Sequence, residues 1–186
     1  WEARRRQYYL HNVLVEQPDL NFHNPEVQEA VLEVMRFWLE RGVDGFRLDT
    51  VNFYTHDRDL RSNPAVTEAR ANLPPVNPFD MQRAVYSRNR PENLPFVERM
   101  RALTDTYDSR MMVGEVGERG DLGIGLMAEY TRGDRRLHMA YSFDLLGPVF
   151  TATHFRHEIE TFFRVAPDGW PCWSFSNHDV NRHVTR

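Results

Sequence analysis

The chain has 186 residues, of which 41% are hydrophobic and 27% are charged, and its formal net charge is −4. This composition is typical of a globular protein with a sizeable core, and it gives no basic surface of the kind that binds nucleic acid. No apolar run reaches membrane-spanning length, and the single cysteine, Cys172, cannot form an internal disulfide. We therefore expect neither nucleic acid nor a membrane among its partners.

Residues 8–23 are rich in apolar residues up to a break at Pro18, and they predict a short strand and a loop. A helix is expected next, because Asn24 suits an N-cap and Pro25 suits the first turn. Apolar residues then recur at helical spacing until Gly42, and we interpret Trp38, which belongs to this stripe, as a core residue. Residues 43–49 follow as a short buried strand, so a helix leads into a strand, as in an α/β fold.

Residues 52–93 form a long proline-rich excursion, with a short helix expected near 80–86. Long ordered loops in compact domains are usually functional. Further helices are predicted over 94–107, 126–130 and 153–164, and further strands over 111–115, 139–144 and 172–177. The glycines between the second and third strands lack a phosphate-loop pattern and indicate flexibility only.

Acidic residues stand at the ends of these predicted strands. The strand at 43–49 ends on Asp49, with Arg47 two residues earlier, so both side chains should share one face and the cation should keep the carboxylate ionised. Glu115, Asp144 and Asp179 end the later strands. In a parallel barrel these ends form one rim, where two carboxylates about 5–5.5 Å apart suit retaining glycoside hydrolysis. Acids at strand ends also cap helices or bind metals, and that structural alternative stays open here.

Four segments carry a resemblance to a known family. Residues 45–49 (Gly-Phe-Arg-Leu-Asp), 114–115 (Gly-Glu) and 177–179 (Asn-His-Asp) resemble ordered motifs of the α-amylase family of glycoside hydrolases. Residues 17–21 (Gln-Pro-Asp-Leu-Asn) resemble the signature of its oligo-1,6-glucosidase and α-glucosidase branch. The resemblance implies an α/β fold that is part of a (β/α)8 TIM barrel, with residues 1–186 as one partial catalytic domain covering roughly strands 4–7. It also implies that the chain is an internal fragment.

The resemblance also implies roles. Asp49 would be the nucleophile that forms a β-glucosyl-enzyme, and Arg47 would keep it ionised and aimed. Glu115 would protonate the leaving oxygen and then deprotonate water. Asp179 would be the third catalytic carboxylate and would grip hydroxyls of the distorted ring.

Three further residues would belong to the substrate site. His178 would hydrogen-bond a sugar hydroxyl, and Arg182 would orient the acid three residues before it. Thr50, next to the nucleophile, would bear on linkage preference.

Other residues offer competing interpretations. Glu118 competes with Glu115 as the acid, but it lies beyond the strand end and is expected on the surface. Asp144 matches no family motif, so we expect a structural role. Phe53 and Tyr54 are candidate sugar-stacking aromatics.

Two other pairs of residues could in principle bind a metal. His154 and His157 are three residues apart on a helix, but they lack carboxylate or cysteine partners at ligand spacing, so packing is expected. Asp57 and Asp59 hint weakly at calcium, but two acids on a loop are usually solvated. We expect no metal or cofactor in this segment. Calcium binding elsewhere in a longer protein stays open.

The expected function is a retaining α-glucoside hydrolase acting on α-linked glucose in maltose-like disaccharides and short oligosaccharides. The alternative is a sucrose- or trehalose-type glucosyl transferase or isomerase of the same family, and a third is a non-catalytic member. The expected partner is a small oligosaccharide, and the oligomeric state is open. We expect a cytoplasmic location, with periplasmic and secreted locations left open by a missing N-terminus. A partial barrel exposes strand edges, so the chain alone should be inactive and poorly soluble.

Overall fold

The computed structural model describes residues 1–66 and 81–185. Three strands, β1 (Gly45–Leu48), β2 (Met111–Glu115) and β3 (Met139–Tyr141), alternate with four helices. The helices are α1 (Pro25–Leu39), α2 (Leu94–Thr104), α3 (Gly120–Tyr130) and α4 (Ala152–Val165). The described residues also contain four 3₁₀ turns: η1 (Val51–Phe53), η2 (Pro91–Asn93), η3 (Asp144–Leu146) and η4 (His183–Thr185).

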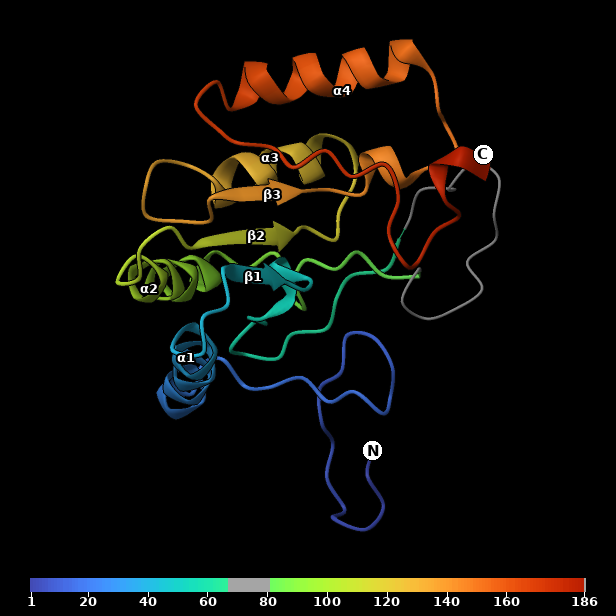
Figure 1. The fold of residues 1–186 in the computed structure, drawn as a ribbon. Coiled ribbons are helices and arrows are strands. Elements are labelled where there is room, and N and C mark those ends of the chain that lie inside the picture. The colour runs from blue at the N-terminus through green and yellow to red at the C-terminus, as the bar shows by residue number, and fades with distance from the viewer. Residues whose placement is uncertain (67–80, 186) are drawn as a thin grey trace.

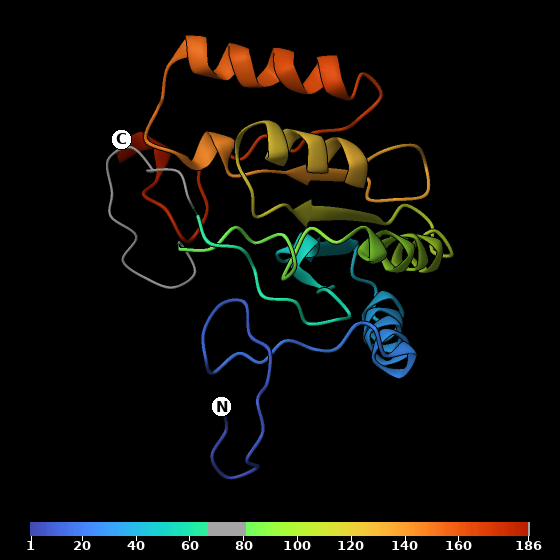
Figure 2. The ribbon, with the colours of Figure 1, turned by 180° about the vertical axis from the view of Figure 1, so that it is seen from behind.

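The three strands form one parallel sheet in chain order, and their arrows point the same way in Figure 1. α1 lies beyond β1 at one end of the stack and α4 lies beyond β3 at the other, in both views (Figures 1 and 2). Parallel pairing requires a crossover between strands, and α2 and α3 supply those crossovers. All three carboxyl ends therefore meet at one edge of the sheet.

The pairing register separates a core face of the sheet from the opposite face. Leu48 pairs with Gly114, which in turn pairs with Ala140, and this row faces the helices. Side chains on a strand alternate between faces, so the neighbouring positions of each strand point the other way. Arg47 and Glu115 occupy such positions.

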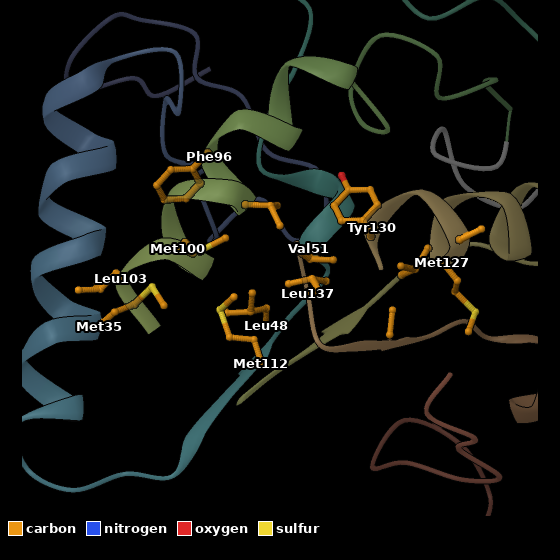
Figure 3. Close-up of a cluster of buried hydrophobic side chains, with 14 of the residues drawn as sticks. Met35, Leu48, Val51, Phe96, Met100, Leu103, Met112, Met127, Tyr130 and Leu137 are labelled. Carbon is orange, nitrogen blue, oxygen red and sulfur yellow. The ribbon is translucent and has the colours of Figure 1, made fainter. Parts of the chain in front are cut away.

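Buried apolar side chains from the helices and from the core face of the strands pack into a single cluster (Figure 3). Met100 of α2 and Met112 of β2 are 1% and 0% exposed. Each such fully buried side chain contributes about 1.5–3 kcal/mol of transfer free energy. The cluster holds the sheet and helices in place and so fixes where the strands end.

α1 begins as predicted, because the Asn24 side chain accepts a hydrogen bond from the Glu26 N–H at 2.9 Å and Pro25 opens the helix. Its buried stripe, however, consists of Leu32, Met35 and Leu39. The interpretation of Trp38 as a core residue is wrong, since Trp38 is 47% exposed. Val34 and Phe37 are exposed beside it, because no described element packs on that side of α1.

Some predicted elements differ from the structure. The strand expected over 172–177 does not form: Pro171 makes one parallel bridge to Ala140, and the Cys172 N–H donates to the Ala140 carbonyl at 2.8 Å. Among the described residues, β3 is the only strand that could pair with a strand at 172–177. Residues 8–23 form no strand, and β3 ends at Tyr141 instead of 144.

The predicted flexible glycine turn is instead the start of α3, which extends the helix expected over 126–130 back to Gly120. A Cβ at Gly123 would lie 3.0 Å from the Glu118 carbonyl oxygen and 3.3 Å from Ser142 Cβ. The missing side chain therefore lets α3 approach its neighbours closely.

The long loop after β1 returns on itself. The Asp57 N–H donates to the Tyr86 carbonyl at 2.7 Å, and the Arg83 N–H donates to the Pro64 carbonyl at 2.8 Å. Of the helix expected near 80–86, residue 80 lies outside the described residues, and 81–86 are not helical. Within the described ranges no helix has the length and apolar character needed to span a bilayer.

Candidate active site

Two predicted site residues meet at the end of β1. The Arg47 Nη1 lies 2.5 Å from Oδ1 of Asp49, so the two side chains share one face as the sequence predicts. Arg47 also reaches across the sheet, where its Nη2 lies 2.8 Å from Oε1 of Glu115 at the end of β2. One guanidinium therefore holds both carboxylates.

The two carboxyl groups differ in exposure. The Asp49 side chain is 71% exposed, whereas that of Glu115 is 3% exposed. Burial would raise the pKa of Asp49, but hydrogen bonds to Arg47 and Glu115, with the nearby charges of Arg47 and His178, hold that pKa below its ordinary value. Asp49 is therefore an ionised carboxylate open to an incoming ligand at neutral pH.

Tyr141 of β3 completes this group, and the sequence analysis did not identify it. Its hydroxyl accepts hydrogen bonds from Arg47 at 2.9 Å and 3.2 Å and donates to Oε1 of Glu115 at 2.9 Å. Tyr141 pairs with Glu115 in the sheet register. A signal for it existed, because a polar aromatic residue lies in the third predicted strand, next to the strand that Glu115 ends.

Thr50 contributes through its backbone. Its N–H donates to Oε2 of Glu115 at 3.1 Å. Its φ of 37° lies in the left-handed region, which is rare for a β-branched residue and indicates local strain. This turn redirects the chain directly after Asp49 and brings the Thr50 N–H within hydrogen-bonding distance of Glu115.

Two hollows adjoin this turn, and Thr50 and Phe53 line both. The smaller, of about 370 Å³, also includes Asp49 and Asp19, so the segment 17–21 reaches the site. The larger, of about 730 Å³, lies against the N-terminal segment and the loop after β1. Tyr54 lines the smaller hollow, and its ring stacks on Phe22 with centroids 5.1 Å apart.

The residues predicted at the fourth strand end are more loosely connected to this group. The His178 Nε2 lies 3.6 Å from Oδ2 of Asp179, and both side chains are largely exposed. His178 acts electrostatically on Asp49, where its charge lowers the pKa. Asp179 and Arg182 make no hydrogen bond or ion pair with Asp49 or Glu115 within the described part of the chain.

The competing acids have other roles. Glu118 is half-buried instead of lying on the surface as predicted, because its Oε1 lies 2.6 Å from Nε of Arg88 and accepts a hydrogen bond from Asn89 at 2.8 Å. Asp144 accepts hydrogen bonds from the Gly120 N–H and the Ser142 hydroxyl, both at 2.6 Å, so it fixes the start of α3. Its contacts agree with the expected structural role.

One residue of each suggested metal pair is engaged in protein contacts. Asp57 is buried and pairs with Arg61, so it is not the solvated residue that was predicted. His154 Nδ1 lies 3.5 Å from Glu158, and its Nε2 contacts the Asp144 carbonyl at 3.2 Å. Across residues 1–66 and 81–185, no group of three or more His, Cys, Asp or Glu side chains is arranged to hold a metal ion.

A buried amide links the loops that follow β1 and β2. Asn52 accepts a hydrogen bond from the Gly117 N–H at 2.9 Å and donates to the Asn89 side chain at 2.6 Å. Asn52 follows Asp49 by three residues, and Gly117 follows Glu115 by two. This contact keeps the segments after the two carboxylates together.

The sequence model described as "Alpha amylase, catalytic domain" matches residues 1–186. The chain belongs to the alpha-amylase catalytic-domain family. That domain is a (β/α)8 barrel, and the three strands and four helices described above form part of one. The predicted fold class and family resemblance are therefore confirmed.

Two curated proteins resemble the whole chain. A protein named "Probable alpha-glucosidase" from Rhizobium meliloti is 54% identical over 190 residues, and "Maltase A2" from Drosophila melanogaster is 31% identical over 198 residues. The alignments cover all of this chain and 34% of each relative. The chain thus spans about a third of the length of these relatives.

A solved structure is also similar to the chain. The crystal structure of the alpha-glucosyl transfer enzyme XgtA superposes with a TM-score of 0.90 at 49% sequence identity, over all of this chain and 35% of that one. Both hydrolases and glucosyl transfer enzymes are therefore named among its relatives.

Proposed function

We propose that this chain is part of a retaining α-glucoside hydrolase that acts on α-linked glucose in maltose-like disaccharides and short oligosaccharides. The observation that carries the proposal is the pairing of an exposed, ionised Asp49 with a buried Glu115 through one guanidinium, that of Arg47. The relatives named as an alpha-glucosidase and a maltase support the choice of substrate.

The first step forms a covalent intermediate. A carboxylate oxygen of Asp49 attacks the anomeric carbon of the glucosyl ring, and the glycosidic C–O bond breaks. Glu115 donates its proton to the departing oxygen and is left as a carboxylate. The product is a β-glucosyl ester on Asp49.

The second step releases glucose with retained configuration. Glu115 takes a proton from water, the water oxygen attacks the anomeric carbon from the opposite face, and the ester bond to Asp49 breaks. Both carboxyl groups return to their starting states. Arg47 assists both steps because it favours the carboxylate form of Asp49. Asp49 attacks as a carboxylate in the first step and departs as a carboxylate in the second.

The remaining site residues hold the substrate in this proposal, with Asp179 as the third catalytic carboxylate. We propose that Asp179 grips hydroxyls of the distorted ring, that His178 donates to a neighbouring hydroxyl, and that Arg182 orients Asp179. Thr50 lines both hollows, so its side chain is suited to influence the linkage that the site accepts.

Glucosyl transfer is a second candidate, favoured by the similarity to the alpha-glucosyl transfer enzyme. The same residues would serve, with a sugar or another hydroxyl compound replacing water in the second step. Isomerisation of sucrose or trehalose is a special case, in which the released sugar re-enters as the acceptor. A non-catalytic role is disfavoured, because Arg47, Asp49 and Glu115 are present and joined.

The test uses the full-length protein that contains this chain. It should release glucose from at least one of maltose, isomaltose, sucrose and 4-nitrophenyl α-glucoside, and Asp49→Asn should reduce that activity by several orders of magnitude. Asp44→Asn is the matched control, because the Asp44 side chain is 95% exposed and should leave activity unchanged. Activity that survives in Asp49→Asn would refute the mechanism. Isomeric disaccharide with little free glucose would favour transfer over hydrolysis.

A further inference from the structure

The hydroxyl of Tyr141 has a fixed orientation. It lies 2.9 Å and 3.2 Å from two nitrogens of Arg47 and 2.9 Å from Oε1 of Glu115. A guanidinium carries donors and no acceptor, so the hydroxyl oxygen must accept from Arg47. Its single hydrogen is then directed to Glu115. Tyr141 is 6% exposed, so water does not compete freely for that hydrogen.

The two oxygens of Glu115 are therefore occupied unequally. Oε1 receives donors from both Arg47 and Tyr141, whereas Oε2 receives one donor, the Thr50 N–H at 3.1 Å. A carboxylate offers about four acceptor sites, two on each oxygen. Both sites of Oε1 are filled, and the free site is on Oε2.

We propose that Tyr141 is a positioning residue that, together with Arg47, reserves Oε1 of Glu115 and directs the transferable proton to Oε2. The inference rests on the proposed function, in which Glu115 is the acid and base. Tyr141 acts through Glu115 and needs no contact with the substrate.

The surroundings support this arrangement. The ionisable groups that face Glu115 are Arg47 and Asp49 from β1 and the turn after it, Tyr54 directly after η1, and Tyr141 from β3. Burial, together with the hydrogen bond to Glu115, raises the pKa of Tyr141 to about 12, although Arg47 opposes this. Tyr141 is thus a neutral donor across the working pH range.

Proton donation matters most when the leaving group is a poor one. A sugar hydroxyl departs as an alkoxide unless it is protonated, whereas 4-nitrophenolate is a stable anion and needs little help. A defect confined to Glu115 should therefore be large with maltose and small with 4-nitrophenyl α-glucoside. A general structural defect should affect both substrates alike.

The experiment compares kcat/KM for these two substrates in the full-length wild type and in Tyr141→Phe. Loss of one hydrogen bond to a charged group should reduce kcat/KM for maltose by about 10- to 100-fold, with a much smaller reduction for the aryl substrate. Tyr130→Phe is the matched control: this buried hydroxyl accepts from Asn93 at 2.7 Å and, within the described residues, has no hydrogen bond to Arg47 or Glu115. It should leave the ratio of the two kcat/KM values unchanged.

Equal losses on both substrates, or no loss on maltose, would overturn the inference. Should Tyr141→Phe fail to fold, 3-fluorotyrosine at position 141 keeps the ring and hydroxyl but donates more strongly. An unchanged substrate ratio in that protein would equally overturn it. A wild type inactive on both substrates would instead refute the proposed function, and the role of Tyr141 with it.

Discussion

Gly114 offers a direct test of how the core fixes the position of Glu115. A Cβ at Gly114 would lie 2.3 Å from Cδ1 of Leu137 and 3.0 Å from Cγ1 of Val51. Leu137 and Val51 are 1% and 0% exposed, so neither can retreat into solvent. Forcing one methyl group into such a core costs about 1–3 kcal/mol. We therefore expect Gly114→Ala to lower the free energy of unfolding by about that amount.

The same substitution should reduce activity, because Gly114 directly precedes Glu115. A displacement near 1 Å in a reacting group can reduce the rate on the order of 100-fold. Denaturant unfolding and glucose release would be measured on the full-length protein. Gly125→Ala is the control, since a Cβ there meets nothing within 4 Å and should stabilise α3 by about 0.5–1 kcal/mol. Wild-type stability and activity in Gly114→Ala would refute the packing argument.

Two further predictions concern pH. Arg47→Met removes the cation that lowers the pKa of Asp49, so the acidic limb of the kcat/KM profile should move to higher pH; an unchanged limb would contradict the assigned role. Hydrogen bonds from Arg61 lower the pKa of Asp57, so this carboxylate stabilises the fold above its ordinary pKa of about 4, and that stability is lost as the pH falls. Asp57→Asn should have a lower free energy of unfolding than wild type at pH 7, and the difference between the two proteins should shrink as the pH falls. A difference that does not change with pH would count against the pairing of Asp57 with Arg61.

Local sequence signals predicted much of the fold. The Asn24–Pro25 start placed α1, and the strand pattern placed Arg47, Asp49 and Glu115 at neighbouring strand ends. Those features depend on residues close together in the chain. The motif resemblance supplied the family, which the comparison over residues 1–186 confirms.

The missed features depend on contacts between distant segments. Tyr141 is 94 residues from Arg47, and only the strand register brings them together. Glu118 is half-buried because Arg88 and Asn89 return to it from the long loop. Such partners leave no periodic signal in the sequence.

The exposure of Trp38 has a similar cause. The helical spacing of Trp38 predicts that it belongs to the buried apolar stripe of α1. The stripe that meets α2 instead contains Leu39, one position later in the chain. The expectations that the isolated chain is inactive and that residues 1–186 form one partial domain stay predictions. The exposed apolar side of α1 is consistent with poor solubility of the chain alone.

The contact between Thr50 and Glu115 bears on how such a site evolves. The donor is a main-chain N–H, which every residue except proline possesses, while the side chain lines the two hollows. Natural variation at position 50 would therefore change the side chain that lines the hollows and leave the main-chain hydrogen bond to Glu115 in place. At this position the main-chain N–H supports Glu115, and the side chain is free to vary. Proline, which lacks the N–H, is the substitution that would remove this support.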